Sequence, residues 1–159
     1  MKQYCNRLRT DIVIVTVLCL ILISGTGYCE VTKDEIPPII KSGLTAYKSS
    51  GPEAAIIAWI KGSPFDGSKD AMSQANLFKQ VETFYGKYLD YTPIAIINLT
   101  PTTKIIYLSM DFTSGPVFCK FLVYKIQAQD KDNWILSSKF NFNTEPEKVL
   151  PDASFDIKK

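Results

Sequence analysis

The stretch KIIYLSMDFTSGPVFCKFLVYKIQ, residues 104–127, decides the fold, because it holds two strand patterns joined by a tight turn. Along residues 104–112 the apolar residues recur with a period of two, which predicts a strand. One face of that strand carries Ile106, Leu108, Met110 and Phe112. The letters TSGP at residues 113–116 are a turn signal, and a second strand follows over residues 117–127. A link this short requires antiparallel neighbours, since a parallel crossover needs about a dozen residues.

Two further strands flank this hairpin with the same period of two. One is predicted over residues 92–99 and the other over residues 134–143, each separated from the hairpin by a polar turn sequence. The four strands therefore form a curled antiparallel meander. The tail from about Thr144 contains Pro146 and Pro151 and is predicted to be irregular.

The chain before this sheet has the apolar spacing of helices. Thr32 and Glu35 have the capping-box spacing and predict a helix that starts near Thr32, or nearer Ile36, because prolines are tolerated only in a first turn. That helix ends at Gly51, a second follows at once, and a third covers residues 69–89. The predicted fold class is α+β, with about three N-terminal helices packed on a curled four-stranded antiparallel meander sheet.

Residues 1–29 have the three-part pattern of a secretory signal peptide. Lys2, Arg7 and Arg9 make a basic start, a continuous apolar run covers residues 12–23, and small residues follow. A spanning helix needs roughly 20 apolar residues, which is more than this run supplies. We therefore expect cleavage, no membrane span in the mature chain, a single domain over residues 30–159, and a periplasmic or secreted location.

The cleavage site itself has alternatives. Small residues at positions −3 and −1 permit a cut before Tyr28 or before Glu30, and the pair Gly27 and Cys29 favours the second. A lipoprotein with its lipid on Cys29 is a third interpretation, although the bulky Tyr28 precedes that cysteine. If Cys29 is retained, an oxidising compartment permits a disulfide with Cys119; otherwise Cys119 is simply a small buried apolar residue.

Composition argues against several classes of function. The chain has 18 Lys and Arg against 16 Asp and Glu; the leader holds three of the basic residues and one of the acids, which leaves 15 of each sign. A neutral domain has no general attraction for nucleic acid. The chain has no His, and both of its Arg residues lie in the leader. Because His is the usual general base and metal ligand, and Arg the usual anion clamp, we expect no metal, no cofactor and no enzyme of the commonest kinds.

Short segments in both halves give the domain a recognisable layout. Residues 51–55, GPEAA, lead to Trp59, residues 84–88 read FYGKY, and Tyr107 and the aromatic run at residues 118–124 follow in the sheet. This arrangement resembles the cystatin-like and nuclear-transport-factor-2-like α+β cone superfamily. Because that superfamily contains enzymes, ligand carriers and interaction modules, the resemblance does not select a function. Its isomerase and dehydratase members use an Asp or His with a Tyr inside the cone, and no motif here matches theirs.

Asp111 is the acid with the most interesting position. Alternation places it on the same strand face as Ser109 and Tyr107. If that face lined an apolar cavity, Asp111 would act as a base with Tyr107 as hydrogen-bond donor, as in a small isomerase or hydratase. The simpler interpretation is a solvated carboxylate near the hairpin end that faces Lys120 across the ladder.

Six aromatic residues are candidates for lining a hydrophobic pocket that holds a small apolar molecule. An ordinary core needs such residues too, so core and pocket are competing interpretations. The set comprises Trp59, Tyr85, Tyr88, Phe118, Phe121 and Trp134.

The outer face of the sheet is the predicted interaction surface. Ile105, Tyr107 and Tyr124 are expected there, where exposed apolar side chains indicate a homodimer or a protein partner. The sequence thus predicts an exported, non-enzymatic domain that binds a partner protein, itself or a small apolar ligand. The alternative is an isomerase-like or hydratase-like enzyme that uses Asp111 and a tyrosine.

Overall fold

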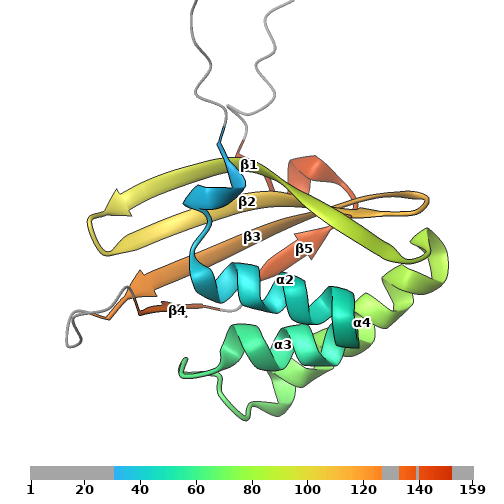
Figure 1. Cartoon of the computed structure of the whole chain (residues 1–159), viewed down its shortest axis with the longest axis horizontal. Helices are drawn as coiled ribbons and strands as arrows, with labels where there is room; N and C mark the ends of the chain where they lie inside the picture. Colours follow the sequence, from blue (N-terminus) through green and yellow to red (C-terminus); the bar gives the residue numbers. More distant parts are fainter. Residues whose placement is uncertain (1–30, 127–132, 139, 152–159) are drawn as a thin grey trace, which may run out of the picture. The chain divides into compact units, whose positions relative to one another are not determined.

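The computed structural model describes residues 31–126, 133–138 and 140–151. Its helices come first in the chain (Figure 1): the short 3-10 helix η1 at Lys33–Glu35, then α2 at Pro38–Ser50, α3 at Pro52–Ile60 and α4 at Lys69–Tyr85. The predicted capping box is present, because the Thr32 backbone N–H donates to Glu35 Oε1 at 3.1 Å. It caps only η1, and the regular helix begins after Pro37, as the paired prolines require.

Helix α4 ends four residues before the predicted Leu89, at Tyr85. Gly86 adopts a φ of 79°, a conformation that other residues rarely adopt, and its N–H closes the helix on the Glu82 carbonyl. The chain then enters β1 at Tyr88, which the sequence pattern had assigned to the helix.

In the described residues, five antiparallel strands form the sheet, in place of the four predicted. They are β1 (Tyr88–Thr100), β2 (Thr103–Phe112), β3 (Gly115–Lys125), β4 (Trp134–Leu136) and β5 (Asn141–Asn143). The order is β1-β2-β3-β4, and β5 also pairs with β3. The sheet does not close on itself, and the fold class is α+β, as predicted.

The predicted fourth strand is divided into β4 and β5, which pair with different halves of β3. Leu136 lies opposite Val123, whereas Asn141 lies opposite Lys120. The chain from Leu136 to Asn141 is therefore two residues longer than the stretch of β3 that it faces. Successive side chains of a strand point to opposite faces of the sheet, so two extra residues keep the same side chains on the core face. Phe140 accordingly stays buried at 6% exposure.

The helices cover one face of the sheet, and the core lies between the two layers (Figure 1). The alternation predicted for β2 and β3 is confirmed, since every second residue of each strand is almost fully buried there. These residues are Ile106, Leu108, Met110 and Phe112 on β2, and Val117, Cys119, Phe121 and Val123 on β3.

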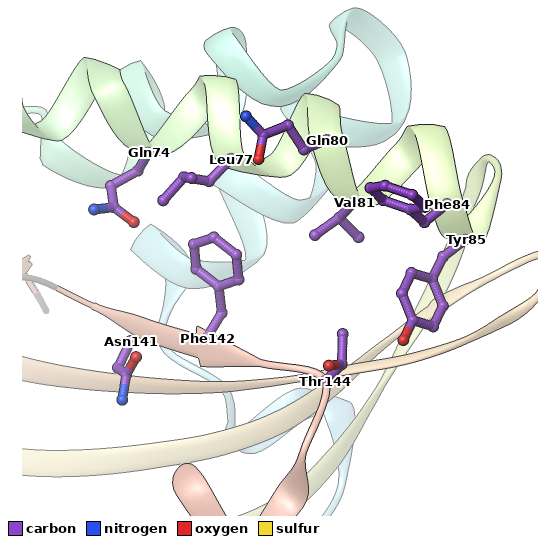
Figure 2. Close-up of a pocket in the computed structure, with 9 residues that line it drawn as sticks. All are labelled: Gln74, Leu77, Gln80, Val81, Phe84, Tyr85, Asn141, Phe142 and Thr144. Atoms are coloured by element: carbon purple, nitrogen blue, oxygen red, sulfur yellow. The ribbon is translucent and has the colours of Figure 1, made fainter.

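The C-terminal segment covers part of the opposite face. After Thr144 the chain continues on the side of the sheet away from α4 (Figure 2), where it forms the 3-10 helix η2 at Pro146–Lys148. Val149 is 5% exposed and Tyr107 is 3% exposed, and both lie outside the main core cluster. The tail predicted to be irregular therefore contains a structured turn. Within the described ranges, no helix is long and apolar enough to cross a membrane.

Candidate functional site

An open groove of about 850 Å³ runs between α4 and β5 (Figure 2). Phe142 points from the strand towards the helix, and Leu77 and Val81 of α4 lie across from it in the same view. The groove is lined by Gln74, Leu77, Gln80, Val81, Phe84, Tyr85, Asn141, Phe142 and Thr144.

The groove exists because α4 has two apolar stripes rather than one. Ala71, Ala75 and Phe78 recur at helical spacing and are buried in the core. Leu77 and Phe84 lie on a neighbouring face and stay 43% and 79% exposed. Nothing in the part of the chain that the structure describes buries this second stripe.

Both walls of the groove are fixed by the core. Phe142 stacks on Phe78 with ring centroids 4.1 Å apart and planes 16° apart. At the far end of α4, the Ser114 N–H donates to the Tyr85 carbonyl at 2.8 Å, and the Tyr85 ring packs so closely on Gly115 that an added Cβ would lie 2.9 Å away. The groove is therefore largely pre-formed.

The polar groups of the groove are uncharged. Its lining contains side-chain amides, one threonine hydroxyl and the Tyr85 phenol, but no carboxylate and no amine. In the described ranges, no group of three or more His, Cys, Asp or Glu side chains is arranged to hold a metal ion. The chemistry that this lining offers is apolar contact and neutral hydrogen bonding.

One edge of β5 faces no other strand of the described chain. The opposite edge pairs with β3 through Phe118↔Asn143 and Lys120↔Asn141. Among the strands of the described residues, none pairs with the second edge. The predicted strand over residues 134–143 was likewise the last of the meander, but the sequence did not predict that α4 lies beside it.

The structure does not bring the six predicted aromatic residues into one pocket. Trp59 and Phe121 are fully buried neighbours, with ring centroids 5.1 Å apart, and belong to the core. Tyr85 lines the groove, and Tyr88 packs on Tyr47 at 4.9 Å.

The remaining two aromatics of that set lie apart from these four. Phe118 lies on the outer sheet face, because it alternates with the buried Val117 and Cys119. Trp134 is partly buried beside the core, and the Lys104 amine lies 5.0 Å from its ring centroid. Of the six, only Tyr85 contributes to the groove between α4 and β5.

Asp111 lies on the outer face of the sheet, on the same side as Ser109 and Tyr107. Its carboxylate accepts hydrogen bonds from Ser109 Oγ at 2.8 Å and from Thr92 Oγ1 at 3.2 Å. The residue opposite it on β3 is Pro116. The expectation that it faces Lys120 is wrong, because β2 and β3 pair in a register that places Lys120 opposite Tyr107.

The predicted interaction surface is partly covered. Tyr124 is 38% exposed and Ile105 is half-buried, but Tyr107 is buried, so its expected exposure is wrong. A neighbouring depression of about 300 Å³ is lined by Leu99, Ile105, Lys120, Leu122, Ser138 and Asn141. A dimer or partner contact on this face stays a prediction.

Cys119 is a free, fully buried thiol on the core face of β3. Burial raises its pKa well above the ordinary value, because the thiolate would lose its hydration. Cys29, the proposed disulfide partner, lies outside the described residues, as do the predicted signal peptide and its predicted cleavage site.

Comparison with known proteins gives no relative from which a function can be carried over. The likeness to the cystatin-like and nuclear-transport-factor-2-like superfamily therefore stays a prediction that depends on the order of helices and strands. No protein-family model, no curated protein and no solved structure matches this chain.

Proposed function

We propose that this protein is an exported, non-enzymatic binding domain whose α4–β5 groove takes an extended, uncharged segment of a partner protein. The observation that supports this most is the pair Leu77 and Phe84, which project beside a strand edge that no described strand pairs with, while the neighbouring stripe of α4 fills the core. Exposed apolar side chains gathered along a groove are typical of an interaction site.

The geometry favours a polypeptide over a compact small molecule. A free strand edge offers backbone N–H and C=O groups to an added strand, and alternate side chains of that strand supply specificity. β5 provides the edge, and the α4 stripe provides apolar contacts on one side of it. The groove is open along its length, as an extended segment requires.

The absence of charged side chains from the groove restricts which partner segments can bind there. A buried charge needs a counter-charge, and the lining supplies none. The amides of Gln74, Gln80 and Asn141 supply both donors and acceptors to neutral polar groups. The partner segment is therefore expected to alternate apolar residues with Ser, Thr, Asn or Gln, and to lack Lys, Arg, Asp and Glu at its centre.

Selection from a phage-displayed library of random short peptides tests this proposal. We expect the enriched peptides to be uncharged and alternating, and to bind Phe84→Gln at least about tenfold more weakly, because burial of a Phe side chain contributes about 1.5–3 kcal/mol. Ile57→Gln is the matched control, since Ile57 is 55% exposed on α3 and outside the groove. Titration by fluorescence anisotropy measures both variants.

Two results contradict the groove as the binding site. One is enrichment of peptides with a central charge. The other is equal affinity of the selected peptides for Phe84→Gln and for the unchanged protein, because Phe84 is the most exposed apolar side chain of the groove.

Export is tested separately from binding, because it depends on the predicted signal peptide and not on the groove. The intact mass of the protein purified from its native source is expected to correspond to a chain that begins at Glu30 or at Tyr28. An acylated Cys29 at the N-terminus indicates a lipid-anchored protein instead. A chain that still begins at Met1 contradicts cleavage.

A further inference from the structure

The depression of about 300 Å³ on the outer face of the sheet is a second candidate site, which shares only Asn141 with the peptide groove. Lys120 and Leu122 flank the buried Phe121 on β3, so both side chains point away from the core. The Asn141 side chain lies on the side of β5 away from α4 (Figure 2). The depression therefore opens on the side of the sheet opposite to the helices.

The strand register separates a polar end of this depression from an apolar end. Lys120 of β3 lies directly opposite Asn141 of β5. Two residues further along β3, and hence about 7 Å away, Leu122 lies opposite Ile105 of β2. Leu99 lies further in the same direction, near the turn between β1 and β2, and is 54% exposed. An amine and an amide thus form one end, and three aliphatic side chains form the other.

Lys120 is the one charged side chain that lines the depression. It is half-buried, and its amine lies 5.8 Å from the ring centroid of Tyr107. Among the ion pairs of the described residues, none includes Lys120. Asp111 lies four residues along β2 from Tyr107, about 13 Å away, and its carboxylate is held by Ser109 and Thr92. An anion in the depression therefore meets a positive charge and no carboxylate of the lining.

We infer that the outer-face depression binds an aliphatic carboxylate. The carboxylate lies between the Lys120 amine and the Asn141 amide, which donates a hydrogen bond to one of its oxygens. The alkyl chain covers Ile105 and Leu122 and extends towards Leu99, which removes apolar surface from water on both sides. A cationic amphiphile is repelled by Lys120, and a small polar anion gains nothing from the aliphatic end. This site does not depend on the proposed peptide groove.

Calorimetric titration of the protein with butanoate, hexanoate and octanoate tests the inference. We expect saturable binding whose affinity rises by up to about fourfold for each added CH₂ group, because a buried CH₂ contributes about 0.8 kcal/mol. Octanol and octylammonium have the same chain without the negative charge, and both are expected to bind more weakly than octanoate. Added salt is expected to weaken octanoate but not octanol, since salt screens a partly exposed ion pair.

Lys120→Met separates the charge from the apolar contact, because methionine keeps an unbranched apolar side chain. We expect it to bind octanoate about threefold to fivefold more weakly, since a partly exposed ion pair contributes up to about 1 kcal/mol. Its affinity for octanol is expected to stay unchanged. Lys61→Met is the matched control, because Lys61 is exposed at the end of α3 and does not line the depression.

Four results overturn the inference. They are an absence of saturable octanoate binding, an affinity that does not depend on chain length, octylammonium binding as tight as octanoate binding, and full octanoate affinity in Lys120→Met. Phe84→Gln distinguishes this site from the groove, because it is expected to bind octanoate unchanged. A loss of octanoate binding in Phe84→Gln also contradicts the inference, since it places the alkyl chain in the groove.

Discussion

Gly43→Ala is expected to lower the free energy of unfolding by about 4 kcal/mol, which combines overpacking with the loss of a buried hydrogen bond. A Cβ atom at residue 43 would lie 2.0 Å from Nε1 of Trp59 and 2.2 Å from its Cδ1. Trp59 is fully buried, and its Nε1 donates to the Ile40 carbonyl at 3.1 Å. The indole must move to admit the methyl group, and the movement breaks that hydrogen bond.

The expected destabilisation is opposite to the usual effect of this substitution in a helix. Residue 43 lies inside α2, where alanine in place of glycine ordinarily stabilises a helix by about 1 kcal/mol. A destabilised variant therefore shows the contact with Trp59 directly. Urea denaturation measures the change, and Ser49→Ala, at an exposed position of the same helix, is the control with an expected change within about 0.5 kcal/mol. A neutral or stabilising Gly43→Ala contradicts the close packing of α2 on α3.

Phe78→Ala is expected to lower the free energy of unfolding by about 3–5 kcal/mol, because it leaves a cavity between the helices and the sheet. Phe78 is fully buried on α4 and contacts aromatic rings from four other parts of the chain. The centroid distances are 5.5 Å to Tyr47, 6.2 Å to Trp59, 6.1 Å to Phe140 and 4.1 Å to Phe142.

Phe84→Ala is the matched control for that variant, since it makes the same chemical change in the same helix. Phe84 is 79% exposed, so its loss is expected to change stability by no more than about 0.5 kcal/mol. Denaturant midpoints of the two variants give the comparison. Similar losses in both contradict the division of α4 into a core stripe and a groove stripe.

The central strands of the sheet were largely predictable, because the patterns that indicate strands and turns lie in neighbouring residues of the sequence. The period of two around Met110 predicted which residues of β2 face the core, and the short turn at residues 113–116 predicted that β2 and β3 pair antiparallel, although not in which register. The end of α4 was not predicted correctly, because Tyr88 continues the helical apolar spacing and only the backbone of Gly86 shows where the helix stops. The break between β4 and β5 depends on pairing with β3, which a strand's own sequence does not reveal.

The candidate site was less predictable than the fold, for a different reason. Periodicity finds an apolar stripe, but it does not say whether another element covers that stripe. Leu77 and Phe84 continue the apolar spacing of α4 and yet are exposed, whereas Tyr107 was expected on the surface and is buried on the face that the C-terminal segment partly covers.

The surplus of two residues between Leu136 and Asn141 determines how far the chain can shorten at this point. Removal of one residue there would leave a surplus of one, which is the ordinary size of a β-bulge, and Phe142 would stay opposite Cys119 as long as β5 keeps its register on β3. Removal of two would restore an unbroken ladder with the same residues inside. The connection between the two halves of the ladder can therefore shorten without exposing the aromatic ring that stacks on Phe78.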